Sequence, residues 1–420
     1  MGSVTSGGTE SCLLAVKIAR ERSRSTRRRP RRGPVSVHAA FRKAAQHLDV
    51  DLTLVPVDPA TGRPPPPTSS RRSTPTTSRS SSCPPVVPAR RRRPGRRGAG
   101  RAARGVPCTW TRASAAGCCR SGPRPGARVP PFDFSVPGVT SISADVHKYG
   151  YAPKGASVLL VRGRDRQRRQ FFATTGWPGY PVVNPTLSGS RSAAPLAAAW
   201  AVSQALGTAG YTALTARCVR ATHALRAAVD AIDGLRVVGR PTGPLVAVAT
   251  DGSVPPERRV DPHLWADAVR SLGWVLQPQP GLVQDDGTRL PHTTHLTITP
   301  VTEAGLDGLV AALGAGADAV RGAGRPDVSG VLAALAGEFA PRADAPTADE
   351  MWGALVGVLA ADDGGPEGDD DRGPLASVLP DRLAPLMALM EVLPAPVAEQ
   401  ALVEIVARVS EPHAEAPGTA

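Results

Sequence analysis

At 420 residues the chain is long enough to bury a substantial core, arranged in one or two domains. No apolar run reaches the roughly 18 residues that a membrane-spanning helix requires, and no basic, apolar leader opens the chain, so we expect a cytoplasmic protein without a membrane span. The formal net charge of +14 would favour a nucleic-acid partner if it were spread over the molecule.

That charge belongs to one tract, residues 68–130. The tract holds 15 Arg and no Lys, Asp or Glu, so the remaining chain has 35 basic and 36 acidic residues and is close to neutral. The tract also lacks the interleaved aromatic residues that stack on bases. Four of the six cysteines lie in it, at spacings that fit neither a zinc site nor a disulfide framework. We therefore expect neither a nucleic-acid partner nor a metal site.

The chain opens on a glycine-rich segment, Gly7, Gly8 and Thr9, followed by an apolar helical run at 12–20. Converging backbone amides and a helix N-terminus favour an anion, although a plain N-cap has the same pattern. Residues 34–45 are typical of a strand end followed by a helix, with His38 at the helix start, where a capping role is the ordinary one. Residues 51–57 alternate like a strand, and 58–62 form a turn.

The tract at 68–130 shows no helical or strand periodicity. Three interpretations compete: a disordered basic linker, a nucleic-acid tail, and GC-rich coding sequence translated in the wrong frame. Read from the last base of the Pro107 codon, residues 108–116 can encode VHVDACLGG. The Asp in that string is fixed, because the single Trp codon ends in G and every Thr codon begins with AC.

A second segment of the tract also encodes a family-like sequence when it is read in a shifted frame. Residues 89–97 permit HGVVDPVAE in the other shifted frame, and residues 101–107 look correct as written. We therefore expect several single-base slips in this tract, and resequencing the gene would decide between a frameshift and a genuine linker.

A lysine segment follows, with the sequence SISADVHKYGYAPKG at 141–155. A strand-like run precedes the pair His147 and Lys148. A turn follows the pair and leads into an apolar strand at 156–161. A lysine at a strand end can form a Schiff base with an aldehyde cofactor, since burial favours the neutral, nucleophilic amine. Spacing alone leaves an ordinary surface dipeptide as the alternative.

Beyond this segment the periodicity predicts helices at 193–206, 210–232, 262–272 and 303–320. Strands are expected at 235–238, 245–250, 274–277 and 295–299. In the tail we expect helices at 328–338, 348–360 and 379–407, with an acidic loop at 362–371 between the last two.

The lysine segment resembles the cofactor-lysine segment of the pyridoxal-phosphate (PLP) dependent group II decarboxylase family, in its sphingosine-1-phosphate lyase branch. The similarity extends over residues 1–20, 34–59 and 131–322. It implies the type I fold: an α/β large domain with a mixed, mostly parallel sheet, and a small C-terminal α/β domain. It also implies PLP as cofactor, with Lys148 as the Schiff-base lysine, His147 beside it, His38 stacked on the ring, and Gly7, Gly8 and Thr9 at the phosphate.

The same resemblance implies a carbon–carbon lyase that cleaves a phosphorylated sphingoid base and works as a homodimer. An amino-acid decarboxylase and a non-catalytic relative are the alternatives. Tyr149, Lys154 and Arg191 are the candidate substrate contacts, with packing, an ordinary turn and a salt bridge as their competing interpretations. The substrate would be a small amine or amino acid, phosphorylated in the lyase case.

Two departures from the family pattern bear on activity. The family has a long segment before the glycine-rich loop, so we expect a late start or a fragment. The aspartate that pairs with the pyridine nitrogen is missing from the tract as translated, so the large domain should be incomplete. We expect residues 1–67 to begin the large domain, 68–130 to be aberrant and disordered, 131–233 to complete the large domain, 234–324 to form the small domain, and 325–420 a helical extension.

Overall fold

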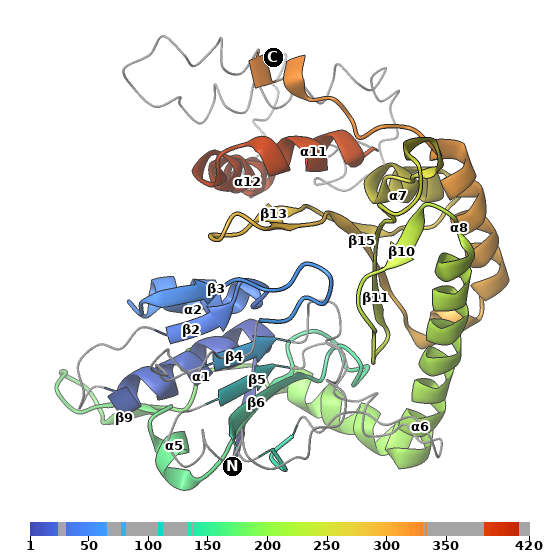
Figure 1. Ribbon diagram of the computed structural model, residues 1–420. Coiled ribbons are helices and arrows are strands. Elements are labelled where there is room, and N and C mark those ends of the chain that lie inside the picture. The colour runs from blue at the N-terminus through green and yellow to red at the C-terminus, as the bar shows by residue number, and fades with distance from the viewer. Residues whose placement is uncertain are drawn as a thin grey trace, which may run out of the picture.

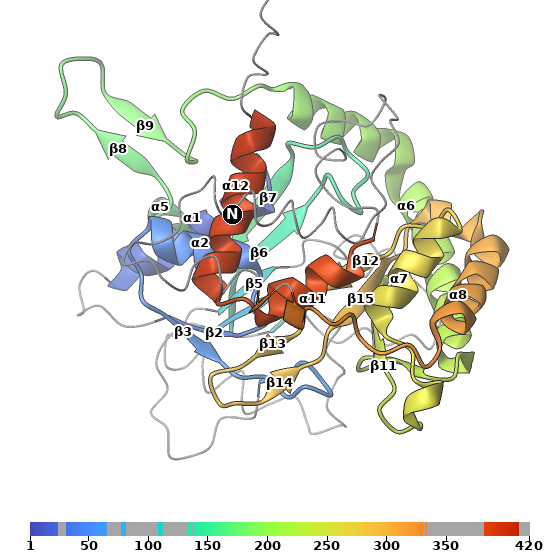
Figure 2. The ribbon, with the colours of Figure 1, turned by 90° about the horizontal axis from the view of Figure 1, so that it is seen from above.

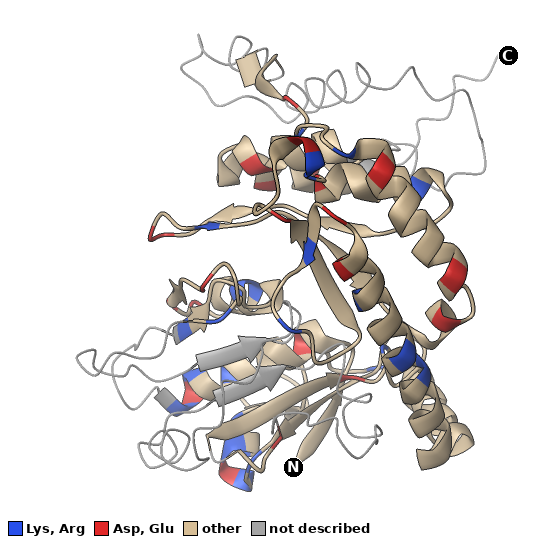
Figure 3. Cartoon of the chain, turned by 45° about the vertical axis from the view of Figure 1, so that its right-hand side comes forward, with Lys and Arg blue, Asp and Glu red and all other residues tan. Residues whose placement is uncertain are grey.

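The computed structural model describes residues 1–23, 31–64, 77–80, 108–111, 133–136, 138–330, 332–333 and 382–410. These residues form a larger unit around a seven-stranded sheet and a smaller unit around a four-stranded sheet (Figure 1). Figure 3 shows acidic and basic residues in both units.

The larger sheet has the strand order β1-β7-β6-β5-β4-β2-β3. The strands β3, β2, β4, β5 and β6 are parallel to one another. Strand β7 is antiparallel to both β6 and β1. The predicted mixed, mostly parallel sheet is therefore confirmed. The strand bounds are Gly2–Thr5 (β1), Arg31–Pro34 (β2), Leu52–Val55 (β3), Thr77–Ser80 (β4), Cys108–Thr111 (β5), Val139–Asp145 (β6) and Ser157–Val161 (β7).

Two central strands, β4 and β5, come from the arginine-rich tract. We expected this tract to be disordered and the large domain to be incomplete, yet these two segments pair with neighbouring strands of the sheet. Strand pairing uses backbone N–H and C=O groups that nearly every residue carries, so a segment without a strand pattern can still complete a ladder between β2 and β6. The rest of the tract lies outside the described residues, and so do the predicted helix at 348–360 and the acidic loop.

Helix α1 (Gly8–Ser23) lies against the sheet. Leu14, Ala15 and Ile18 pack on Leu159 and Val161 of β7. On its other side α1 meets α2 (Ala39–His47), where the buried side chains are those of Cys12, Val37, Ala40 and Phe41. This packing fixes the N-terminus of α1 beside the end of β6.

Helix α6 (Ala194–Ala231) joins the two units and bends at Gly207, where φ is 52° and ψ is −170°. The two helices predicted here are therefore separate, as expected. No heavy atom lies within 4 Å of the position that a Cβ on Gly207 would take, so the backbone conformation, and not a lack of space, requires glycine. In Figure 1 the two arms of α6 run in different directions.

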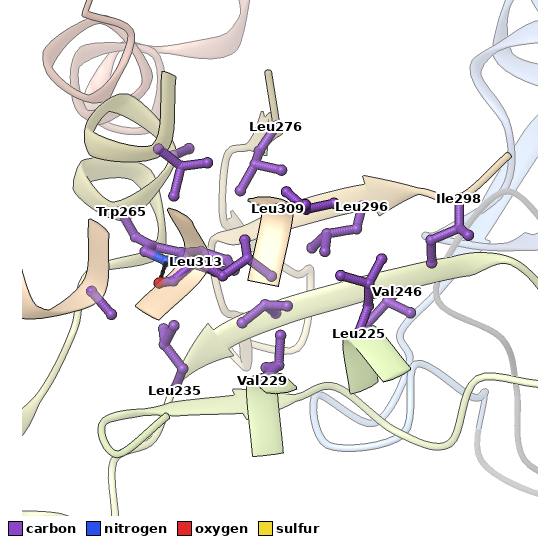
Figure 4. Close-up of a cluster of buried hydrophobic side chains, with 14 of the residues drawn as sticks. Leu225, Val229, Leu235, Val246, Trp265, Leu276, Leu296, Ile298, Leu309 and Leu313 are labelled. Atoms are coloured by element: carbon purple, nitrogen blue, oxygen red, sulfur yellow. Dashed lines mark hydrogen bonds between the residues drawn. The ribbon is translucent and has the colours of Figure 1, made fainter. Parts of the chain in front are cut away.

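The smaller unit has the strand order β10-β11-β15-β12, with all neighbours antiparallel. Its core gathers Leu225 and Val229 of α6, Trp265 of α7 and Leu313 of α8 (Figure 4). Trp265 is fully buried, and its indole N–H donates to the carbonyl of Leu313 at 2.9 Å. The second arm of α6 thus belongs to this core, upstream of residue 234. The bounds are Leu235–Val237 (β10), Leu245–Thr250 (β11), Pro262–Ser271 (α7), Gln277–Gln279 (β12), Thr293–Thr297 (β15), Leu306–Val320 (α8), and the 3-10 turns Pro256–Arg258 (η1) and Pro300–Glu303 (η2).

Two hairpins complete the fold. In Figure 2 the hairpin of β8 (Phe172–Thr174) and β9 (Val182–Asn184), which follows α5 (Arg164–Arg168), projects on the side opposite α7 and α8. The hairpin of β13 (Leu282–Val283) and β14 (Arg289–Leu290) reaches back to the larger unit. There the side-chain amide of Gln284 accepts from the N–H of Val57 at 2.7 Å and donates to its carbonyl at 2.8 Å.

The tail differs from the single helix predicted at 379–407. The structure has α11 (Ala384–Val392) and α12 (Ala395–Ser410), separated at Leu393 and Pro394. Leu393 has extended angles, φ −64° and ψ 142°, because the residue before a proline is sterically excluded from the α region. The predicted strand at 274–277 is also shifted, since β12 begins only at Gln277.

His295 on β15 provides a test of this fold. Burial lowers its pKa from 6.5 to about 4. Below pH 6.5 His295 is protonated in the unfolded chain but stays neutral in the folded chain. The free energy of unfolding therefore decreases as the pH falls from 6.5 to about 4. The loss should reach about 3 kcal/mol. We expect His295→Gln to remove this part of the pH dependence, as measured by urea unfolding between pH 7 and pH 4. Equal slopes for both proteins would contradict the assignment.

Candidate active site

Hydrogen bonds of the buried residues Thr5, Glu10 and Ser11 hold the glycine-rich loop in place. The hydroxyl oxygens of Thr5 and Ser11 are 2.7 Å apart. The Glu10 carboxylate accepts from the N–H of Ser6 at 2.6 Å and, through its other oxygen, from the N–H of Leu187 at 3.0 Å. Sequence reasoning missed Glu10, because its partner Leu187 lies in a distant loop. The N-terminus of α1 is therefore held in a defined position, where its first backbone N–H groups lack partners within the helix.

The lysine turn begins where β6 ends, at Asp145. The N–H of Lys148 donates to the carbonyl of Asp145 at 3.3 Å. The N–H of His147 donates to the carbonyl of Ala156 at 3.1 Å, and its Nδ1 lies 2.9 Å from the same oxygen. Tyr151 has a φ of 56°, an unusual backbone conformation for a non-glycine residue. Such strain persists only where the surroundings impose it, and it is concentrated at functional sites.

Aromatic residues hold that turn in place. Tyr149 is buried, and its hydroxyl donates to the carbonyl of Ile298 at 2.8 Å. Tyr151 stacks on Tyr211 with ring centroids 6.2 Å apart, and the Tyr211 hydroxyl donates to the carbonyl of Gly150 at 2.9 Å. Tyr149 is thus packed in this structure, its role at a substrate stays a prediction, and these contacts link the turn to the smaller unit.

Lys148 makes an ion pair with Asp145, with Nζ 2.9 Å from Oδ2. The Asp145 side chain is 2% exposed and that of Lys148 is 41% exposed, so the amine reaches a buried carboxylate from a solvent-accessible side. The Ser157 hydroxyl on the paired strand β7 also donates to Asp145. Asp145 was not among the site residues predicted from the sequence. Its place at the carboxyl end of a strand could have indicated it, because ligands bind at that end of the strands in open α/β sheets.

The glycine loop and the lysine turn are in direct contact. A Cβ added to Gly8 would lie 2.6 Å from one oxygen of Asp145 and 2.9 Å from the other. A Cβ on Gly7 would lie 3.9 Å from Cε1 of His147. The structure thus brings the predicted residues Gly7, Gly8, His147 and Lys148 together, and Thr9 is exposed at the start of the same helix.

His38 lies in the same site. Its Nδ1 accepts from the N–H of Ala40 at 3.1 Å and so caps α2, which was the ordinary role considered from sequence. Burial lowers the pKa of His38, the nearby Lys148 ammonium lowers it further, and the Asp145 carboxylate acts in the opposite direction. The imidazole is therefore neutral at pH 7 and lies within electrostatic reach of the lysine.

The other two candidate substrate contacts lie at the margins. Lys154 is exposed in the turn after the lysine. Arg191 donates to the carbonyl of Val4 on β1 at 2.7 Å, which places its guanidinium beside the strand that leads into the glycine loop. Their roles at a substrate stay predictions.

Replacing Gly8 by Ala is expected to damage both the fold and the loop. The new methyl group would overlap the Asp145 carboxylate, so we expect a loss of about 1–3 kcal/mol in the free energy of unfolding. Gly176→Ala is the matched control, because no heavy atom lies within 4 Å of its Cβ position. Urea unfolding measures both variants, and equal midpoints would contradict the contact.

These groups fit a small ligand that carries both a phosphate and an aldehyde. The helix N-terminus with two glycines suits the phosphate, the amine of Lys148 suits the aldehyde, and a neutral imidazole can pack on a ring.

Ser143, on the same face of β6 as Asp145, is fully buried, and its hydroxyl has no hydrogen-bond partner among the residues that the structure describes.

Comparison with known proteins agrees with this chemistry, although no protein-family model matches the chain. The sphingosine-1-phosphate lyase of Arabidopsis thaliana is 33% identical over 302 residues, which is 71% of this chain and 52% of that protein. The solved structure of sphingosine-1-phosphate lyase from Burkholderia pseudomallei is 30% identical, with a TM-score of 0.65, over 82% of this chain and 75% of that chain. A glutamate decarboxylase from Lactobacillus brevis shares the fold, with a TM-score of 0.58 at 16% identity over 78% of this chain and 76% of that chain.

The fold and the lysine-centred site define the class as PLP-dependent enzymes of the type I fold, as predicted. Within that class, the chain belongs to the sphingosine-1-phosphate lyase branch of the PLP-dependent group II decarboxylase family. It spans about half the length of the curated relatives that it matches. Within the described residues, no helix combines the length and apolarity that crossing a bilayer demands.

Proposed function

We propose that this chain binds PLP through Lys148 and acts as a carbon–carbon lyase on a phosphorylated sphingoid base. The observation that carries the proposal is the convergence of three separate segments. The lysine turn, the N-terminus of α1 and His38 come from distant parts of the sequence and meet around one buried carboxylate.

Each group has a distinct task in this proposal. The backbone amides at Gly8 and Thr9 would hold the phosphate, the amine of Lys148 would hold the aldehyde carbon, and the neutral imidazole of His38 would pack against the ring. His147, held by Ala156, closes the site beside Gly7. Bound PLP supplies an electron sink for the carbanion that forms when a C–C bond breaks.

The substrate is tested by product analysis. The chain is loaded with PLP and incubated with sphingosine-1-phosphate or with a panel of amino acids. The proposal predicts a long-chain aldehyde and phosphoethanolamine from the first. Carbon dioxide from an amino acid would instead favour the decarboxylase alternative, and no product with PLP bound would favour a non-catalytic relative.

We infer that the arginine-rich tract is the family's aspartate-bearing segment translated in the wrong reading frame. The aspartate meant here is the one that pairs with the pyridine nitrogen. In the shifted frame the Asp codon falls on position 111, the last residue of β5. The register of β5 and β6 pairs position 111 with Ser143, the residue whose buried hydroxyl lacks a partner among the described residues. A carboxylate at 111 would be the cross-strand neighbour of that hydroxyl, which supports the inference.

We also propose a cytoplasmic homodimer. Large apolar side chains are exposed on the β8–β9 hairpin and on the first arm of α6: Phe172, Trp177, Tyr180, Val183, Leu196 and Trp200. Tyr180 is 75% exposed and Trp200 is 65% exposed, which is unusual for a protein that works alone. A second copy of this chain is the partner that the family resemblance implies, and sedimentation equilibrium would detect it.

A further inference from the structure

The carboxylate of Asp145 has no assigned role in the function proposed above. A buried carboxylate costs free energy unless charges or hydrogen bonds compensate it. The partners described for Asp145 are the Lys148 amine and the Ser157 hydroxyl. The charge of Asp145 raises the pKa of the Cys12 thiol and acts to raise that of His38, and Lys148 is its ion-pair partner.

The position of Asp145 is set by the backbone. It is the last residue of β6 and pairs directly with Ser157 across the antiparallel β7. The turn that follows returns Lys148 over its own strand end, an i,i+3 arrangement. The Asp145 carboxylate therefore holds the amine of a side chain that is 41% exposed.

The same carboxylate faces the glycine loop. Its two oxygens lie against Gly8, at the start of α1. A phosphate bound at that helix terminus would be close to a second negative charge, and such a pair of like charges is unfavourable in a buried site. Phosphate binding is easier if Asp145 carries a proton.

We infer that Asp145 is a positioning residue that holds the Lys148 ammonium beside the phosphate loop and takes up its proton when the amine attacks the aldehyde. This inference rests on the proposed PLP function. Nζ gives one proton to Oδ2, and its lone pair forms the bond to the aldehyde carbon. The two remaining amine protons leave with the aldehyde oxygen as water. The protonated Asp145 then no longer repels the phosphate, so one proton transfer serves both the lysine and the loop.

The test compares Asp145→Asn with the wild-type chain in two measurements. The first is acylation of Lys148 by acetic anhydride in the cofactor-free protein, followed by peptide mass spectrometry with Lys154 as the internal reference. The second is the rate of covalent PLP attachment, trapped by borohydride reduction. Asp165→Asn is the matched control, because it removes an exposed i,i+3 ion pair with Arg168.

In Asp145→Asn we expect acylation of Lys148 to rise about tenfold, because the amine is no longer held against a buried carboxylate. We expect PLP attachment to slow about tenfold, because the lysine loses both its position and its base. Opposite changes in the two rates are a signature that a merely structural role would not produce. Asp165→Asn should change neither rate.

Two outcomes would overturn the inference: unchanged acylation of Lys148, or faster acylation with unchanged PLP attachment. A wild-type chain that takes up no PLP would contradict the proposed function instead, and the acylation result would still decide whether Asp145 restrains the amine. If Asp145→Asn fails to fold, Ser157→Ala keeps the carboxylate but loses its cross-strand donor. That variant should slow PLP attachment and leave acylation unchanged, and an unaltered attachment rate would count against the inference.

Discussion

Replacing Lys148 by Ala is expected to abolish covalent PLP attachment and with it all cofactor-dependent activity, a loss of about a thousandfold or more. Among the described residues, Lys148 is the lysine whose amine pairs with Asp145, the carboxylate that lies against Gly8. Without it, the cofactor could be held only by its phosphate and ring contacts. The visible absorbance of bound PLP and the mass of the borohydride-reduced protein measure the effect.

Two further variants make this experiment specific. Lys148→Arg keeps a cation next to Asp145 but cannot attach to an aldehyde, so it should fold like the wild type and still fail to incorporate PLP. Lys154→Ala removes an exposed lysine of the same turn and should incorporate PLP normally. Incorporation by Lys148→Ala at another lysine with full activity would show that the site lies elsewhere.

Restoring a carboxylate to β5 is expected to have the second large effect. In Thr111→Asp we expect cofactor-dependent turnover to rise about a hundredfold, the scale on which one well-placed electrostatic group acts in an active site. The reason is that a carboxylate beside the pyridine nitrogen keeps it protonated and improves the electron sink. Turnover with saturating PLP is the measurement.

The matched control is Thr111→Asn, which has the same shape without the charge and should give no gain. A block exchange of residues 108–116 for VHVDACLGG restores the whole shifted-frame segment and should exceed the single variant. If neither the variant nor the exchange raises turnover, the frameshift interpretation loses its functional support. Sequencing of the gene then tests it directly, because an intact frame as translated would contradict it.

Much of the larger unit could be read from local patterns. The alternation at 51–57, the strand-like run before His147 and the apolar run at 156–161 become β3, β6 and β7, because a strand must place alternate or successive side chains in a core. The glycines at 7 and 8 and the helical run after them become the loop and α1. The bend at Gly207 followed from the separation of two helical patterns.

Other elements could not be read in this way. β4 and β5 have no strand pattern, and they exist in the sheet because their neighbours offer unpaired backbone groups. The break at Pro394 was missed because the apolar period runs through it, although the steric effect of proline on Leu393 was available. Glu10 was missed because its partner Leu187 lies 177 residues away.

The sequence by itself determined the family, and it predicted Lys148 as the cofactor lysine and the glycine-rich segment as the phosphate loop. A fifteen-residue run and a glycine turn carry that information in residue types that local chemistry requires. Only the tertiary structure decided that Asp145 lies between Lys148 and Gly8, and that position 111 lies beside the buried hydroxyl of Ser143. The reason is physical: strand register and helix packing, which depend on the whole core, set the distances between segments that are far apart in the chain.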